Sequence, residues 1–309
     1  MDVKSELNKT GGFKNLELLA KQVVEGFIAG MHKSPFHGFS AEFAEHKIYN
    51  QGESTRHIDW KLFAKTDKLY TKRFDEETNL RCHLIIDNSS SMHYPAKPSY
   101  TIDNLNKISF SVLAAAALMK MLKKQRDAVG LSVYSDNYEY YAPEKGSERH
   151  HQMLYDQLNS ILKQPKVDSN TKTYTYLHQI AENIHRRSLI FLFTDMFQTD
   201  VNDKALFDAL RHLKHNKHEV VVFHVLDKSK EVNFDFDNAP RKFIDVETKE
   251  VINVYPETIK ENYKAAVTTY ISELRNKCGQ YKIKYVEVDI NSSFDKVLTT
   301  FMVERHKFS

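Results

Sequence analysis

The chain has 309 residues, of which 44 are Lys or Arg and 41 are Asp or Glu, and hydrophobic residues make up 41% of it. A chain of this length and composition can bury a substantial core. The nearly balanced charge, with no basic stripe, argues against a protein built to bind nucleic acid.

The first 80 residues differ from the rest. A helix is predicted near Asn15 to Ala29, a polar and aromatic stretch follows from Met31 to Lys65, and residues 69–74 (LYTKRF) predict a strand. This region has too few periodic apolar positions to fold alone. We therefore expect residues 1–80 to pack on a second unit formed by residues 81–309.

From residue 81 onward, short apolar runs alternate with amphipathic segments. Residues 82–87 predict a buried strand, and a helix is predicted from about Asp103 with one apolar face. Further strands are predicted at 129–135, 138–143, 188–195, 219–226 and 281–288, and further helices at 153–162, 176–184, after 203, at 257–277 and at the C-terminal end. This alternation predicts an α/β fold, with a Rossmann-like parallel sheet covered by helices on both faces. Residues 243–254 (FIDVETKEVINV) predict an inserted hairpin.

Several common binding and catalytic motifs are absent from the sequence. The nine glycines include no pair two or five positions apart, so neither the dinucleotide-binding turn nor the phosphate-binding loop is present. Cys82 and Cys278 do not form a metal-ligand pair. His212, His215 and His218 recur every third residue, but no Cys or carboxylate completes a zinc site, so we expect a solvated helix face.

One group of residues has the pattern of a metal site. The strand that ends at Asp87 is followed by hydroxyls at Ser89 and Ser91, and a second apolar strand ends at Thr194 and Asp195. Parallel strands bring their carboxyl ends to one edge of a sheet, so Asp87 and Asp195 are expected to face one crevice. Carboxylates and hydroxyls are hard oxygen ligands, which suit Mg²⁺. The alternative is that these side chains only cap the following helix.

The motif resembles the metal-ion-dependent adhesion site of von Willebrand factor type A domains. Residues 38–79 also resemble the upstream signature of the domain-of-unknown-function 58 family, whose members are often associated with MoxR-type AAA+ ATPases. The matching elements are SAEF at 40–43, with Ser40 in place of a glycine, YNQG at 49–52 and RHIDW at 56–60. The resemblance extends from about Leu16 to Arg305.

The resemblance implies a set of metal ligands. Asp87, Ser89 and Ser91 match the first metal loop and Asp195 the third. In the second loop the family places a Thr six positions before a helical Leu. The Thr at this position is Thr171 here, and Thr173 and Thr175 lie nearby. The implied cofactor is Mg²⁺, with Mn²⁺ or Ca²⁺ as alternatives.

We expect a metal-dependent protein-binding module and not an enzyme. A partner's Asp or Glu would complete the metal's coordination, and the family implies a MoxR-type AAA+ ATPase or its client, in protein assembly or maturation. One alternative is a metal-dependent phosphohydrolase using Asp87; another is a metal-independent scaffold. Nucleic-acid and membrane partners are not expected. No apolar run reaches the roughly 20 residues of a membrane span, so we expect a cytoplasmic protein.

Overall fold

The structure is a computed structural model of the whole chain. It describes residues 16–31, 46–48, 60–72, 80–96, 101–102, 104–135, 137–163, 173–196, 203–245 and 250–307. Short apolar runs bounded by turns form buried strands, and the amphipathic segments between them form helices, as the sequence predicts.

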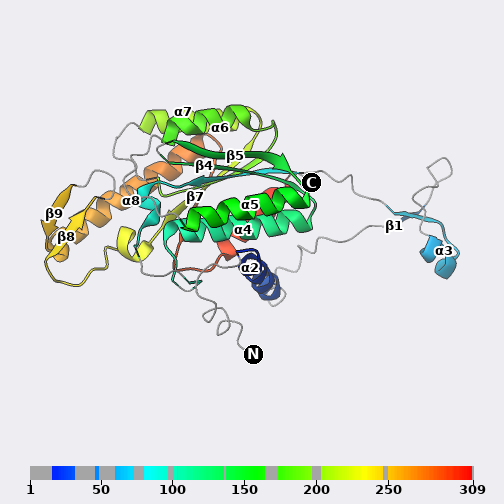
Figure 1. Cartoon of the computed structure of the whole chain (residues 1–309), viewed down its shortest axis with the longest axis horizontal. Helices are drawn as coiled ribbons and strands as arrows, with labels where there is room; N and C mark the ends of the chain where they lie inside the picture. Colours follow the sequence, from blue (N-terminus) through cyan, green and yellow to red (C-terminus); the bar gives the residue numbers. More distant parts are fainter. Residues whose placement is uncertain are drawn as a thin grey trace.

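A six-stranded sheet lies at the centre of the described residues (Figure 1). Its strands are β3 (Arg81–Asp87), β4 (Ala128–Tyr134), β5 (Tyr138–Lys145), β6 (Leu189–Thr194), β7 (Glu219–Leu226) and β10 (Lys284–Asp289). They lie in the order β10-β7-β6-β3-β4-β5. The predicted α/β fold is therefore confirmed, and its first strand, β3, lies in the interior of the sheet.

One edge of the sheet departs from the predicted parallel arrangement. β5 pairs antiparallel with β4, whereas the other neighbouring pairs of this sheet are parallel. Only residues 135–137 separate β4 from β5, and a parallel connection needs a crossover of about a dozen residues or more. The short connection therefore forces a hairpin.

Helices cover both faces of the sheet (Figure 1). One core cluster joins the sheet to α2 (Leu16–Met31), α4 (Lys107–Lys124), α5 (Glu148–Lys163) and α9 (Asp295–His306). A second cluster, on the opposite face, joins it to α6 (Thr173–Asn183), α7 (Asp203–His215) and α8 (Pro256–Gln280). The domain thus has three layers, as the parallel strands require for burial on both sides.

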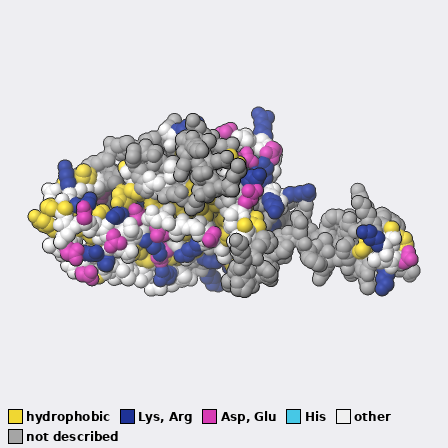
Figure 2. Space-filling model, turned by 90° about the horizontal axis from the view of Figure 1, so that it is seen from below, with side chains coloured by type: hydrophobic (Ala, Val, Ile, Leu, Met, Phe, Trp, Pro, Cys, Tyr) yellow, Lys and Arg dark blue, Asp and Glu magenta, His cyan; other side chains and the backbone are white. Residues whose placement is uncertain are grey.

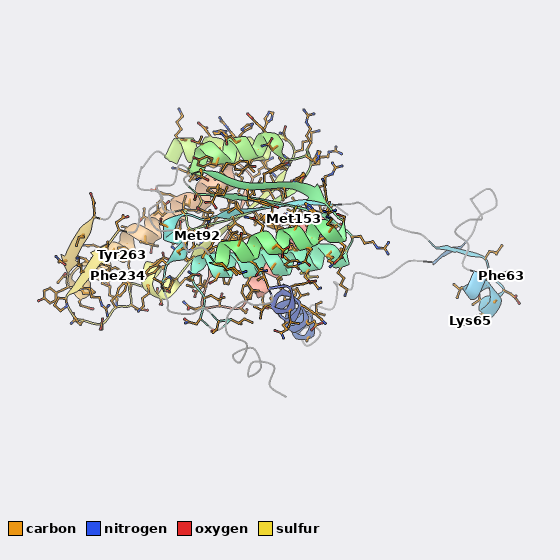
Figure 3. The ribbon with its side chains drawn as sticks, viewed as in Figure 1. Phe63, Lys65, Met92, Met153, Phe234 and Tyr263 are labelled. Atoms are coloured by element: carbon orange, nitrogen blue, oxygen red, sulfur yellow. The ribbon has the colours of Figure 1, made fainter. Side chains whose placement is uncertain are left out.

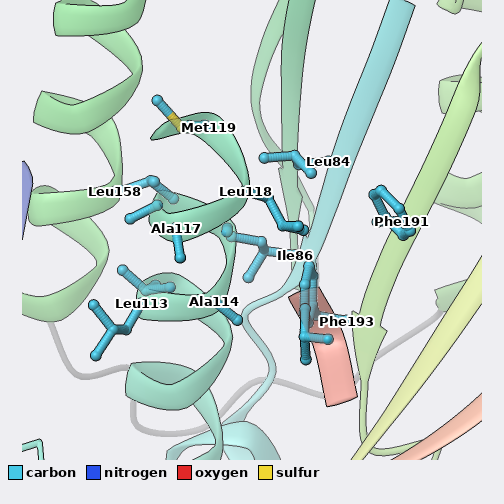
Figure 4. Close-up of a cluster of buried hydrophobic side chains, with 14 of the residues drawn as sticks. Leu84, Ile86, Leu113, Ala114, Ala117, Leu118, Met119, Leu158, Phe191 and Phe193 are labelled. Atoms are coloured by element: carbon cyan, nitrogen blue, oxygen red, sulfur yellow. The ribbon is translucent and has the colours of Figure 1, made fainter. Parts of the chain in front are cut away.

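Helix α4 is buried on nearly every side, which the prediction of one apolar face did not anticipate. Every residue from Lys107 to Met119 is buried. Figure 4 shows Leu118 of α4 lying against Ile86 of β3, while Leu158 of α5 lies on another side of α4. The remaining side is covered by α2, whose Glu17 accepts a hydrogen bond from Lys120 at 3.2 Å.

The other described elements lie outside the central sheet. β1 (His46–Ile48) pairs antiparallel with β2 (Tyr70–Lys72), and together with α3 (Trp60–Thr66) they lie to one side of the α/β domain in Figure 1. The signature residues 40–43 and 49–52, Arg56 and Asp59 fall outside the described residues, as does the Trp60 side chain. The boundary at residue 80 stays a prediction.

The inserted hairpin is confirmed. β8 (Arg241–Ile244) and β9 (Val251–Val254) form a separate two-stranded antiparallel sheet, with Phe243 opposite Ile252 and Ile244 opposite Val251. Two short helical turns complete the fold, η3 (Ser90–His93) after β3 and η4 (Lys228–Val232) after β7.

The packing of α2 can be tested with two adjacent leucines. Leu19 is buried in the core that α2 shares with α4, whereas Leu18 is 47% exposed. Leu19→Ala should lower the free energy of unfolding by about 2–5 kcal/mol, because it leaves a cavity. Leu18→Ala, the matched control, should change it by about 0.5 kcal/mol or less. Equal effects in denaturant titrations would show that α2 is not part of the cooperative core.

Candidate metal centre

The predicted metal residues lie where the direction of the sheet connections changes. Numbered along the chain, the strands of the central sheet have the order 3-2-1-4-5-6, so the chain leaves β3 toward one edge and β6 toward the other. Ligands bind at the carboxyl ends of the strands at such a switch point. Asp87 is the last residue of β3, and Asp195 directly follows β6.

Both oxygens of the Asp87 carboxylate accept hydrogen bonds. The backbone N–H of Ser89 donates to Oδ1 at 3.0 Å, and the hydroxyl of Thr194 donates to Oδ2 at 2.7 Å. Asp87 is only 2% exposed. These contacts fix the carboxylate between the end of β3 and the end of β6.

The protonation of Asp87 reflects this setting. Burial, and next the charge of Asp195, raise its pKa from the ordinary value of 3.8 to about 6, although hydrogen bonds from Ser89 and Thr194 act in the opposite direction. The structure therefore brings Asp87 and Asp195 close enough to repel each other. Burial, and next the charge of Asp87, raise the pKa of the Tyr134 hydroxyl well above its usual range.

The hydroxyls of Ser89 and Ser91 lie side by side, with 3.1 Å between their Oγ atoms. Neither serine caps the long helix that follows: Ser89 is the N-cap of η3 but makes no capping hydrogen bond with its side chain, and α4 is capped by Asn106 in a capping box with Ser109. The capping alternative is therefore wrong for Ser89.

This donor set fits a small divalent cation. Adjacent ligands of octahedral Mg²⁺ lie about 3 Å apart, because metal–oxygen distances are about 2.0–2.1 Å. The spacing of the two serine hydroxyls matches this value. A carboxylate has about four acceptor positions, so Asp87 can keep its two hydrogen bonds and still bind a metal. Among the described residues no group of three or more His, Cys, Asp or Glu side chains is arranged to hold a metal ion, so such a site would depend on hydroxyl ligands.

Lys107 contacts Asp195, although no pattern in the sequence indicates this role. Nζ of Lys107, the first residue of α4, donates to Asp195 Oδ2 at 2.8 Å and to Glu231 Oε1 at 2.5 Å. The side chains of Lys107 and Asp195 are each 2% exposed. Burial lowers the pKa of Lys107, but the charges of Asp195 and Glu231 outweigh it, so the pKa lies above its usual value.

The second predicted loop is only partly described. Thr171 lies outside the described residues, and so does the side chain of Thr173 in the first turn of α6. Thr175 is exposed. The choice of Thr171 as a ligand stays a prediction.

A second polar group lies within the sheet, away from the predicted site. His83 Nδ1 lies 2.6 Å from Glu144 Oε1, and its Nε2 lies 2.7 Å from Ser132 Oγ. The order of contacts is that of a hydrolase triad, yet all three side chains are buried within β3, β4 and β5. A Cβ on Gly130 would come within 2.5 Å of His83 Nδ1, so the ring occupies space that only a glycine leaves open. These hydrogen bonds therefore have a structural role: they link β3, β4 and β5, and the His83 ring fills the space beside Gly130.

The predicted solvated histidines divide into different environments. His215 is exposed, and His212 contacts His178, with 2.9 Å between their Nδ1 atoms. His218 is buried, so the prediction of a solvated side chain is wrong for this residue. Its Nδ1 accepts a hydrogen bond from the backbone N–H of Ser188 at 3.1 Å.

The fold is that of an α/β domain whose mostly parallel sheet is covered by helices on both faces, with Asp87 at the carboxyl end of an interior strand. The model of the family described as "Protein of unknown function DUF58" matches residues 45–272, and the chain belongs to this family. The uncharacterized protein Rv1480 of Mycobacterium tuberculosis is 22% identical over 216 residues, covering 69% of this chain. The chain spans 64% of the length of that relative.

Two solved structures align with this chain at low sequence identity. The conserved hypothetical protein BatB from Bacteroides thetaiotaomicron aligns with a TM-score of 0.44 and 14% identity, over 74% of this chain and 100% of BatB. The VWA domain of SpRpn10 aligns with a TM-score of 0.38 and 11% identity, over 72% of this chain and 94% of that domain. Within the described residues, no helix combines the length and apolarity needed to cross a membrane. Cys82 and Cys278 are free and buried.

Replacing the Asp87 carboxylate should abolish metal binding without lowering the stability of the metal-free protein. Asp87→Asn removes the repulsion from Asp195 and a buried charge, so the metal-free variant should melt at or above the temperature of the wild type at pH 7.5. Mg²⁺ at ten times its Kd should stabilise the wild type by about 1.4 kcal/mol and leave Asp87→Asn unchanged. Asp156→Asn, on the exposed side of α5, is the control and should retain the shift. A Mg²⁺ shift that survives in Asp87→Asn would exclude this carboxylate as a ligand.

Proposed function

We propose that this protein is a metal-dependent protein-binding module. Asp87, Ser89, Ser91 and Asp195, with Thr171, would hold a divalent cation, Mg²⁺ before Mn²⁺ or Ca²⁺. A carboxylate of a partner protein would complete the coordination. The observation that carries the proposal is the buried Asp87 carboxylate at the switch point of the sheet, beside two hydroxyls whose oxygens lie 3.1 Å apart.

The electrostatics of the site support a bridging cation. Asp87 and Asp195 raise the local negative charge, which would repel a partner's carboxylate. A divalent cation would remove this repulsion and, because Mg²⁺ usually keeps several water ligands, would leave positions that a partner's oxygen can occupy. Partner binding and metal binding would then depend on each other.

Exposed hydrophobic residues on the inserted hairpin support a protein partner. Four apolar residues of the hairpin and its end are about half exposed, and we call them the hairpin patch. Ile244 (53%) and Val251 (47%) pair on one face of the hairpin, Ile252 (60%) lies on the other, and Tyr255 (56%) follows β9. Figure 2 shows hydrophobic side chains gathered at the end of the molecule where the hairpin lies. Exposed apolar groups of this kind mark interaction surfaces.

The hairpin patch is connected to the metal centre by contacts. Phe243 of β8 stacks on Phe234 with ring centroids 5.5 Å apart, and Phe234 lies 4.5 Å from the ring of Tyr263 (Figure 3). The Tyr263 hydroxyl donates to the backbone oxygen of Glu231 at 2.9 Å, and the Glu231 carboxylate accepts a hydrogen bond from Lys107. Packed side chains therefore link the hairpin to the lysine that contacts Asp195.

The family suggests the class of partner. As part of the proposal, we assign this role to a MoxR-type AAA+ ATPase or its client, in the assembly or maturation of other proteins in the cytoplasm. The alternative of a phosphohydrolase using Asp87 would need an acid to protonate the leaving group; Ser89 occupies the position where D-x-D phosphatases carry their second Asp.

Removing the metal tests the bridging role. Affinity for a purified MoxR-type ATPase should fall at least tenfold in EDTA and in Asp87→Asn, and return when Mg²⁺ is added to the wild type. Equal affinity with and without EDTA would favour the metal-independent scaffold. Mg²⁺-dependent hydrolysis of a phosphomonoester that is lost in Asp87→Asn would favour the phosphohydrolase.

The hairpin patch is tested separately. Ile252→Lys places a charge in the apolar contact and should weaken partner binding about tenfold or more, as for a central interface residue. Its Mg²⁺-dependent thermal shift should match that of the wild type, because Ile252 makes no contact with the metal residues. Val303→Lys, on the exposed side of α9, is the matched control and should bind normally. Normal binding by Ile252→Lys would remove the patch from the interface.

A further inference from the structure

Four charged side chains lie in or beside the candidate metal centre, and we call them the charge cluster. Lys107 Nζ contacts Asp195 Oδ2 at 2.8 Å and Glu231 Oε1 at 2.5 Å, and Asp87 lies close enough to Asp195 for the two carboxylates to repel each other. The side chains of Lys107 and Asp195 are 2% exposed, and that of Glu231 is 15% exposed. Solvent therefore screens these charges poorly.

Glu231 is held in place independently of Lys107. Its Oε2 accepts the backbone N–H of Asp227 at 2.7 Å, and its backbone oxygen accepts the hydroxyl of Tyr263 at 2.9 Å. Lys107 is fixed at the start of α4, where its backbone N–H donates to the Tyr94 oxygen at 3.1 Å. The ammonium group is thus anchored from two sides and neutralises charge at a fixed position.

The charges of the cluster do not cancel. Three carboxylates oppose one ammonium group, which leaves two negative charges in excess when all are ionised. The nearby His224 adds none at neutral pH, because burial lowers its pKa to about 4. One bound divalent cation would bring the cluster to neutrality, whereas without Lys107 the excess would be three charges, suited to a trivalent cation.

We propose that Lys107 determines which cation charge the site prefers: by neutralising one of the three carboxylates, it matches the cluster to a single divalent cation. The proposal rests on the proposed function in that a cation binds beside Asp87. Lys107 is not a ligand in this scheme. It acts through its contacts with Asp195 and Glu231. The carboxylate of Glu231 brings the negative charge excess of the cluster to two, which one divalent cation balances.

Two substitutions that shift the charge in opposite directions test this role. The measured quantities are the Kd values of the full chain for Mg²⁺ by calorimetry and for Tb³⁺ by sensitised luminescence. Lys107→Met should increase the preference for Tb³⁺ over Mg²⁺ on the order of tenfold, because one more negative charge favours the ion of higher charge. Glu231→Gln should weaken Mg²⁺ binding and decrease this preference by a similar factor. Circular dichroism of each variant establishes that it is folded.

The double variant and a distant lysine provide the controls. Lys107→Met with Glu231→Gln restores the wild-type charge excess and should restore a preference near that of the wild type, even if Lys107→Met alone fails to fold. Lys120→Met, about 20 Å further along the same helix, should leave both Kd values unchanged. An unchanged preference in Glu231→Gln, or a shifted preference in the double variant, with normal Mg²⁺ binding by the wild type, would contradict the role of Lys107 and leave the metal-dependent function standing. Failure of the wild type to bind either cation would overturn the metal-dependent function as well.

Discussion

Asp195 and Lys107 form an ion pair that lies almost entirely out of water, 88 residues apart in sequence. Breaking such a pair by removing one partner leaves a buried charge and costs about 3–5 kcal/mol. The pair therefore fixes where α4 begins relative to the end of β6. Because α4 is the central helix of its layer, its position in turn determines how α2, α5 and α9 can pack. The geometry of the candidate metal centre and the packing of the core thus depend on the same contact.

The elements and the metal motif could be predicted from the sequence because both depend on local patterns. Buried strands appear as short apolar runs, and Asp87 with its two hydroxyls lies within five consecutive residues. The strand order and the switch point then bring Asp195 to Asp87, because parallel strands share one edge. Thr171 could be named only through the family resemblance, and it lies outside the described residues.

Other features depend on contacts between distant segments, which a local pattern does not contain. Lys107 resembles any polar residue at the start of a helix, and only its approach to Glu231, 124 residues later, shows that it is buried in an ion pair. The hydrogen bonds of His83 join three strands, and the burial of His218 depends on Ser188. In each case the sequence shows a titratable residue, whereas the fold determines whether it meets solvent or a partner.

The near-complete burial of α4 has a consequence for how the chain folds. Its covering helices come from both ends of the chain, α2 from the N-terminal side and α9 from the C-terminal side. Arg305 of α9 also donates to Asp127, the residue before β4, at 2.8 Å across 178 residues. Folding must therefore wait for contacts between distant segments, which slows it. A chain still emerging from the ribosome would expose the apolar side chains of the 18-residue α4 until α9 is made, and it would need protection from aggregation during that time.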